Sequence, residues 1–155
     1  MKVFVIALFS ILVLTACSSN DGGESYFKEG IKECEKGNYV NAVSLFRKSA
    51  EQKNSDAQYY LGLCYYDGWG VDVDVAEAVR WFRKSAEQGN IDAQLELGMS
   101  YFYGDGVEKN LVEAVKWYRK SAEHGGLEAQ YLLGTCYYNG DGVEKNLVEA
   151  VKWYR

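Results

Sequence analysis

Proline is absent from the 155 residues, and histidine occurs only once, at His124. Because no proline interrupts a helix from within, we expect long helices whose ends are set by the 16 glycines. His124 has no second histidine and no nearby cysteine with which to form a metal site or a catalytic pair. We therefore interpret it as a surface residue at a helix C-terminus.

An excess of basic charge is also missing. Lysine and arginine number 17 against 22 aspartates and glutamates, which gives a formal net charge of −5. Nucleic-acid-binding proteins normally carry a basic stripe that displaces counterions from phosphate. Here the cations alternate with glutamates on the same segments, which is typical of a solvated helix face. We expect no nucleic-acid partner.

The sequence has no run of about 20 apolar residues, the length that a membrane-spanning helix needs. The apolar stretch from Val3 to Leu14 is shorter, and it follows the positive charge of Lys2. This length and order are typical of a cleaved signal peptide. An ordinary secretory signal would satisfy the same pattern.

The stretch Leu14-Thr15-Ala16-Cys17 resembles the signal of a bacterial lipoprotein. The resemblance implies a signal peptide over residues 1–16 and a lipid-modified Cys17, whose acyl chains hold the protein on a membrane. Residues 17–24 would then be a flexible tether. Ser18 resembles the residue that directs such proteins to the outer membrane, so we expect a place in the bacterial cell envelope, at the outer membrane and facing the periplasm.

The remainder of the chain repeats with a period of 36 residues. Gly104–Arg119 and Gly140–Arg155 are both GDGVEKNLVEAVKWYR, and Gly68–Arg83 keeps the same frame. Each unit predicts two helices, at about residues 56–66 and 75–88 in the first. Their expected core stripes, with Trp81 beside the second, are Ala57, Leu61 and Tyr65, and Ala78, Phe82 and Ala86. Gly-x-Gly-Val turns connect the helices, and Gly62 and Ala78 are small enough for two helices to approach closely.

This pattern of A-x₃-L-G-x₂-Y-x₂-G-x-G-V, A-x₂-W-[FY] and K-S-A-E-x-G resembles the Sel1-like repeat, a relative of the tetratricopeptide repeat. The resemblance implies an all-α, right-handed α-solenoid of antiparallel helix pairs, with units at 56–91, 92–127 and 128–155. The last unit is incomplete, because Arg155 precedes the segment that closes the earlier ones. Residues 25–55 follow a tetratricopeptide-like spacing, and we expect them to form a capping helix pair.

A second apolar stripe runs along each first helix, next to the core stripe, and it differs more between units than the core does. By resemblance to tetratricopeptide arrays, this face lines the concave side and binds the partner. Packing against the neighbouring unit could equally use these residues, and we assign about half of them to it. The predicted groove residues are Tyr59, Leu63, Tyr66, Leu95, Met99, Phe102, Tyr103, Tyr131, Thr135 and Tyr138.

Three further patterns could indicate chemistry. Ser25 and Lys28 match the S-x-x-K motif of penicillin-recognising enzymes, but no K-T-G or S-D-N accompanies it, and an N-cap role explains Ser25. The Gly-Asp-Gly turns lack the ligand spacing of a calcium loop. Cys34, Cys64 and Cys136 are interpreted as buried apolar residues, although a bridge between Cys34 and Cys64 is conceivable.

The sequence thus predicts a non-catalytic, lipid-anchored scaffold that binds a protein or peptide in a concave aromatic groove, without cofactor or metal. The alternative is a cell-wall-associated enzyme or a binder of peptidoglycan fragments, with the β-lactamase-like activity described for some relatives of the family.

Overall fold

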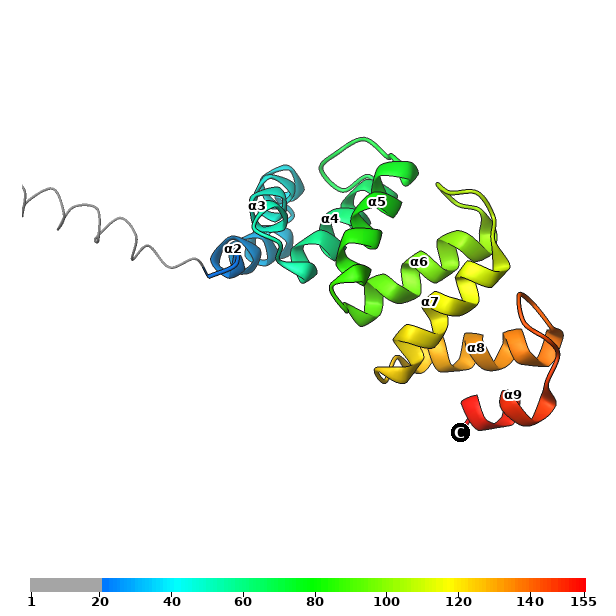
Figure 1. The fold of residues 1–155 in the computed structure, drawn as a ribbon. Helices are drawn as coiled ribbons and strands as arrows, with labels where there is room; N and C mark the ends of the chain where they lie inside the picture. Colours follow the sequence, from blue (N-terminus) through cyan, green and yellow to red (C-terminus); the bar gives the residue numbers. More distant parts are fainter. Residues whose placement is uncertain (1–20) are drawn as a thin grey trace, which may run out of the picture.

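A computed structural model describes residues 21–155, and the predicted signal peptide and Cys17 lie outside this range. The described part is all-helical (Figure 1). Its helices are α2 (Glu24–Glu35), α3 (Tyr39–Glu51), α4 (Ser55–Asp67), α5 (Val75–Glu87), α6 (Ile91–Tyr103), α7 (Leu111–Glu123), α8 (Leu127–Asn139) and α9 (Leu147–Trp153).

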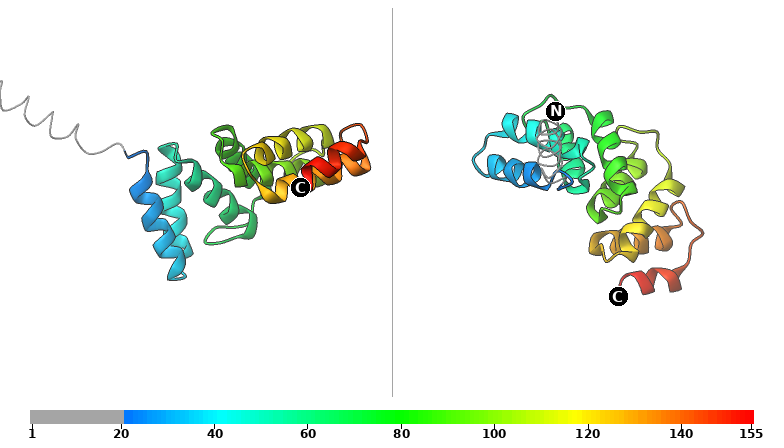
Figure 2. Two further views of the ribbon diagram at one scale, coloured as in Figure 1. Left: turned by 90° about the horizontal axis from the view of Figure 1, so that it is seen from below. Right: turned by 60° about the vertical axis from the view of Figure 1, so that its left-hand side comes forward.

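Successive helices pack against each other in the order of the chain. They form the antiparallel pairs α2/α3, α4/α5, α6/α7 and α8/α9, and the pairs follow a curved path (Figures 1 and 2). The predicted all-α solenoid of helix pairs is therefore confirmed. In such an array each pair buries its apolar faces only against the pairs before and after it.

The core repeats with the period of the sequence. Three clusters of buried side chains lie along the solenoid, and the equivalent residues Ala57, Ala93 and Ala129 are fully buried, as are Leu61, Leu97 and Leu133. The predicted stripe of Ala78, Phe82 and Ala86 on α5 is buried too. Tyr65 is only half-buried, because its hydroxyl reaches the surface and accepts a hydrogen bond from Arg47 at 2.6 Å.

A glycine on the first helix of each unit allows an aromatic ring of the second helix segment to pack directly on the backbone of the first helix. The Phe82 ring of α5 lies over Gly62 of α4, where an added Cβ would come within 2.5 Å of the ring. Tyr118 lies over Gly98 and Tyr154 over Gly134 in the same way. The close approach expected at Gly62 is confirmed, and the Phe82 ring is the group that demands it.

The turn between the helices of a unit requires glycine for its conformation. Gly68 and Gly70 have φ values of 78° and 72°, the left-handed region that L side chains avoid. Gly70 also lies against the start of α3 in the preceding pair, where a Cβ would meet the Tyr39 carbonyl at 2.4–2.5 Å. Each turn therefore helps to fix one pair against the previous one.

The N-terminal boundary differs from the prediction. Residues 21–24 belong to the folded part rather than to a tether, since Gly23 is buried and its carbonyl accepts a 2.7 Å hydrogen bond from the Ser49 hydroxyl. Ser25 is not the N-cap, because it already lies inside α2. The N-cap residue is Gly23, and the Asp21 carboxylate supplies the capping hydrogen bonds by accepting from the backbone N–H groups of Gly23 and Ser25, each at 3.0 Å.

Candidate functional site

The predicted groove residues divide into two sets in the structure. Five of them pack between adjacent units and are half-buried. Tyr59 and Leu63 of α4 contact the cluster formed mainly by α5 of the same pair and α6 of the next pair. Leu95, Met99 and Phe102 of α6 contact the equivalent cluster formed by α7 and α8. These side chains hold the units together, which is the role that the sequence left open for about half of the stripe.

The other predicted aromatics stay exposed on the first-helix face, which we define as the surface formed by α4, α6 and α8. Tyr66 is 41% exposed, Tyr103 63%, Tyr131 62% and Tyr138 54%. Thr135 is half-buried, and its hydroxyl donates to the Tyr131 carbonyl at 3.0 Å. Exposed rigid aromatic rings at this density are typical of protein-binding surfaces.

Two neighbouring cavities open on the first-helix face, and Tyr103 is a wall of both. The first has a volume of about 270 Å³ and is lined by Tyr66, Glu96, Met99, Ser100, Tyr103 and Asp105. The second, of about 180 Å³, is lined by Phe102, Tyr103, Tyr118, Leu132, Thr135, Cys136, Asn139 and Asp141. We call them the Glu96 cavity and the Tyr118 cavity. Together they place carboxylates and aromatic rings side by side.

The first-helix face carries charge of one sign. Helices α4, α6 and α8 contain no lysine and no arginine, but they contain Asp56, Asp67, Asp92, Glu96 and Glu128. Burial, together with the charges of Glu128, Asp67 and Asp92, raises the pKa of Glu96 to about 7. The face is therefore anionic, and one of its carboxylates changes charge near neutral pH.

The second helices carry the cations. Arg47 of α3, Arg83 of α5 and Arg119 of α7 each donate a hydrogen bond to a tyrosine hydroxyl 18 residues later, at 2.6–2.7 Å. Lys84 and Lys120 lie over the rings of Trp81 and Trp117, at 3.7 and 3.9 Å from the ring centres. Our sequence analysis missed the arginine–tyrosine pairs, although their constant spacing of 18 residues is visible in the sequence.

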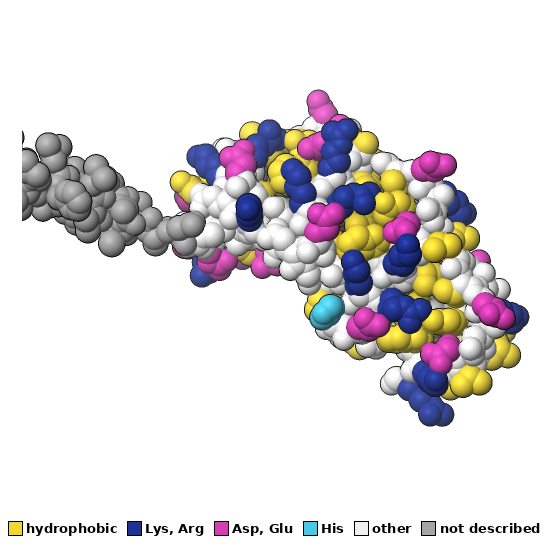
Figure 3. Space-filling view, viewed as in Figure 1, with side chains coloured by type: hydrophobic (Ala, Val, Ile, Leu, Met, Phe, Trp, Pro, Cys, Tyr) yellow, Lys and Arg dark blue, Asp and Glu magenta, His cyan; other side chains and the backbone are white. Residues whose placement is uncertain are grey.

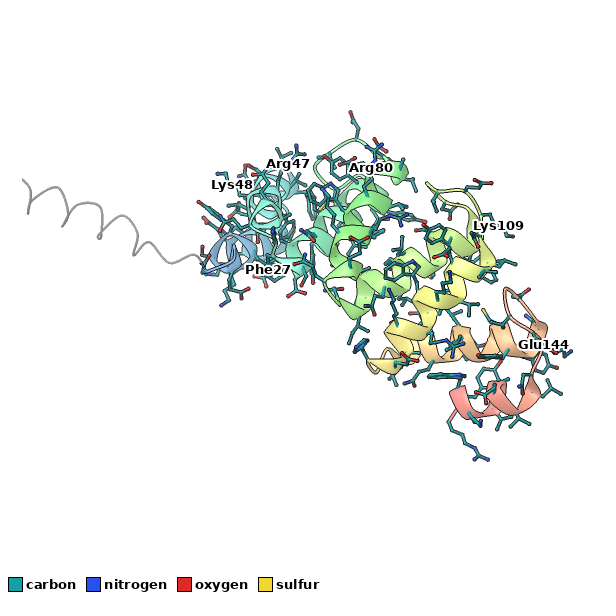
Figure 4. The ribbon with its side chains drawn as sticks, in the orientation of Figure 1. Phe27, Arg47, Lys48, Arg80, Lys109 and Glu144 are labelled. Atoms are coloured by element: carbon teal, nitrogen blue, oxygen red, sulfur yellow. The ribbon has the colours of Figure 1, made fainter. Side chains whose placement is uncertain are left out.

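The two faces of the solenoid therefore differ in charge. In the view of Figure 3, lysine and arginine side chains alternate with acidic ones over hydrophobic patches. Figure 4 places Arg47, Lys48 and Arg80 on α3 and α5, among the second helices.

The other candidate residues occupy ordinary positions on helices. His124 is exposed at the end of α7, with Nδ1 2.7 Å from the Lys120 carbonyl oxygen, as the sequence predicted. Lys28 of the S-x-x-K segment pairs with Glu24, the residue before that segment, at 3.1 Å. Within residues 21–155 no group of three or more His, Cys, Asp or Glu side chains could hold a metal ion.

The three described cysteines are unbridged. Cys64 and Cys136 are buried and Cys34 is half-buried, as expected for small apolar residues. Burial raises the pKa of Cys64 to about 12 and that of Cys136 to about 11, which keeps both thiols protonated and unreactive. Cys34 packs against the same core cluster as Cys64 without forming the conceivable bridge.

Comparison with protein families identifies the repeats. The family model described as "Sel1 repeat" matches residues 22–54, 55–90, 91–126 and 127–155, and thus nearly all of the described chain. Its first match covers α2 and α3, the pair that the sequence led us to describe as tetratricopeptide-like. A comparison with curated proteins gave no match.

Solved structures include several similar proteins. A Sel1 repeat protein from Oxalobacter formigenes is 41% identical, with a TM-score of 0.80 over 83% of this chain and 53% of that one. The uropathogenic Escherichia coli protective antigen c5321 is 39% identical, with a TM-score of 0.83 over 86% of this chain and 29% of that one. The chain thus spans about half of the length of the first protein and less than a third of the second.

Cysteine rich protein B of Helicobacter pylori shares the fold at 22% identity. Its TM-score is 0.57, over 73% of this chain and 96% of that one.

Proposed function

The chain belongs to the Sel1 repeat family, and on that premise we propose that it is a lipid-anchored, non-catalytic scaffold that binds a protein or peptide on its first-helix face. Sel1-repeat proteins generally mediate protein–protein interaction, and the family is typically a non-enzymatic repeat scaffold. Repeat arrays suit this task because stacked pairs present an extended surface whose residues can vary while the core is kept.

The observation that carries the proposal is the pair of exposed rings, Tyr66 and Tyr103, at the wall of the Glu96 cavity. A soluble monomer gains no stability from aromatic rings that stay in water. In an interface the same rings bury a large area at a low cost in conformational entropy. A partner that covers them would supply the burial that the solenoid does not.

Membrane attachment is the second part of the proposal. It is supported by the lipoprotein-like Leu14-Thr15-Ala16-Cys17, which lies outside the described residues. Between residues 21 and 155 the structure contains no helix with the length and apolar character needed to span a bilayer. An acylated Cys17 would hold the solenoid at the outer membrane, facing the periplasm, with its first-helix face free for a partner.

Photo-crosslinking in intact cells tests the binding face. We would replace Tyr66 or Tyr103 with p-benzoylphenylalanine and use Val112, which is 54% exposed on α7, as the matched control. We expect the first-helix positions to capture a defined partner that the Val112 position does not. Equal capture at all three positions, or no capture at the tyrosines, would refute the proposal.

Tyr59 is a poor choice for this experiment, because its ring packs 6.0 Å from that of Phe82 in the core. Its removal would destabilise the array itself. Tyr66 and Tyr103 avoid this problem, since a large part of each side chain is exposed.

A further inference from the structure

The middle unit departs from the repeat at one position. Glu96 stands where the preceding unit has Tyr60 and the following unit has Leu132. Tyr60 and Leu132 both pack against core clusters, whereas Glu96 brings a half-buried carboxylate to the same place on α6. A carboxylate at an apolar position of a repeat costs stability unless something compensates its charge.

No cation in the described part of the chain compensates this charge. Within residues 21–155, no lysine, arginine or histidine forms an ion pair with Glu96. The Nζ atom of Lys109, on the turn between α6 and α7 (Figure 4), lies over the Phe102 ring, 6.0 Å from its centre, and forms no ion pair with Glu96.

The groups that face Glu96 from the surrounding helices are acidic or neutral. They are Tyr59 and Asp67 of α4, Asp92 of α6, Tyr118 of α7 and Glu128 of α8. The negative charges of Asp67, Asp92 and Glu128 and the burial of Glu96 both favour the protonated form of the Glu96 carboxyl, in agreement with its raised pKa.

The adjoining cavity adds a second unpaired polar group. Tyr118 is 1% exposed, and it lines the Tyr118 cavity. Its hydroxyl forms no hydrogen bond with the residues that the structure describes, whereas that of the equivalent Tyr154 lies 3.3 Å from the Thr135 hydroxyl. Because Tyr118 lines an open cavity, its hydroxyl is available to a ligand that enters the cavity.

We propose that the Glu96 cavity receives a lysine or arginine side chain of the partner, so that the segment bound on the first-helix face is cationic. This inference rests on the proposed function. The aliphatic stem would lie along Met99, and the cation would lie between the Tyr66 and Tyr103 rings and pair with Glu96 and Asp105. A neighbouring side chain of the bound segment would enter the Tyr118 cavity. There the Tyr118 hydroxyl would form a hydrogen bond with the backbone of the segment.

Charge complementarity supports this occupant over a neutral or acidic one. The first-helix face presents five carboxylates and no cation on its helices. An acidic partner would add to that repulsion, and an apolar one would leave the Glu96 charge buried without a partner. A cationic side chain removes the unfavourable interaction and adds a favourable one.

Fluorescence anisotropy with the full chain tests the proposal. The probe is a fluorescein-labelled nine-residue peptide of alternating lysine and alanine, and the comparison peptide carries glutamate in place of lysine. The variants are Glu96→Gln and Glu96→Leu, the latter being the residue of the following unit. Glu87→Gln on α5 is the control, because Glu87 is exposed and its loss changes the net charge equally.

At pH 8 we expect the lysine peptide to bind and the glutamate peptide not to. Each Glu96 variant should weaken binding about tenfold, while Glu87→Gln has little effect. Binding by the unmodified chain should also weaken as pH falls from 8 to 5.5, because Glu96 becomes protonated and loses its charge below a pKa of about 7. The Glu96 variants should lose most of this pH dependence.

Stability provides a readout that separates a binding role from a structural one. The pKa of Glu96 is raised on folding, so its ionisation destabilises the fold increasingly as pH rises from about 4.5 to 7. Glu96→Leu should therefore increase the urea midpoint at pH 8, and this gain should shrink toward pH 4. A variant that folds more stably and yet binds less cannot have lost binding through unfolding.

Four outcomes would overturn the inference. Equal binding of the two peptides, or equal loss with Glu96→Leu and Glu87→Gln, would show that Glu96 receives no cation. If the lysine peptide does not bind while the crosslinkers at Tyr66 and Tyr103 still capture a partner, the proposed function stands and the cationic occupant is wrong. A dimer that Glu96→Lys dissociates would instead identify a second copy of this chain as the occupant.

Discussion

Two buried glutamines show how one residue changes the repeat. Gln58 and Gln94 each donate from Nε2 to a carbonyl of the preceding second helix, at 3.1 and 3.2 Å. The Oε1 atom of Gln58 accepts a 2.7 Å hydrogen bond from Gln88, but His124 stands at the equivalent position for Gln94. Within the described chain, the buried Oε1 of Gln94 has no hydrogen-bond partner.

His124→Gln should therefore stabilise the protein. The new amide can donate to Gln94 as Gln88 does to Gln58, and satisfying a buried acceptor contributes about 1 kcal/mol to the free energy of unfolding. Urea unfolding at pH 7 measures this difference. The reciprocal control, Gln88→His, should lower the value by about the same amount. No change in either variant would mean that Gln94 has another donor.

At the scale of the helix, the ring-on-glycine contact sets how closely two helices pack. Gly62→Ala should reduce the free energy of unfolding by about 2 kcal/mol, because the added methyl overlaps the buried Phe82 ring. This cost exceeds the gain of up to about 1 kcal/mol that alanine brings to a helix interior. Thermal and urea unfolding of the single variant measure the balance.

A double-mutant cycle supplies the control for that contact. Phe82→Leu removes the ring edge that the methyl would meet, so Gly62→Ala should cost about 1 kcal/mol less in its presence. Additive losses would indicate that the steric conflict lies with another group, such as the Ala78 carbonyl at 3.3 Å.

The whole molecule separates charge between its two kinds of helix. The first helices of the last three pairs are anionic. The cations of the second helices are engaged with tyrosine hydroxyls, with tryptophan rings or with glutamates of their own helix. In the proposed arrangement the partner approaches the anionic face, and the acylated Cys17 precedes α2, the helix at one end of the array. Anchoring and binding would then use different parts of the solenoid.

Cys17→Ser tests the anchor. We expect the unmodified protein to sediment with membranes and to incorporate an alkyne-labelled fatty acid, and the variant to lose both properties while its circular dichroism spectrum stays helical. The physical reason is that acyl chains bind a membrane by burying their CH₂ groups, and Cys17→Ser removes the thiol that would carry them. A variant that still sediments with membranes would contradict the lipid anchor.

The period of 36 residues was sufficient to predict the helix pairs and their core. Ala57, Leu61 and Phe82 were expected to be buried and are, because a repeated apolar position must face a repeated neighbour. The N-terminal boundary was less predictable. Asp21 rather than Ser25 caps α2, since capping depends on backbone geometry that several polar residues near a helix start can satisfy.

The sequence by itself determined the architecture, since local helix signals and a strict repeat leave one way to stack the pairs. Only the tertiary structure decided which aromatics of the second stripe are exposed. Tyr59 and Tyr66 look alike in sequence, yet packing against α5 and α6 half-buries Tyr59 and leaves Tyr66 open to solvent. The isolation of Glu96 likewise became visible only when helices distant in sequence brought their carboxylates together.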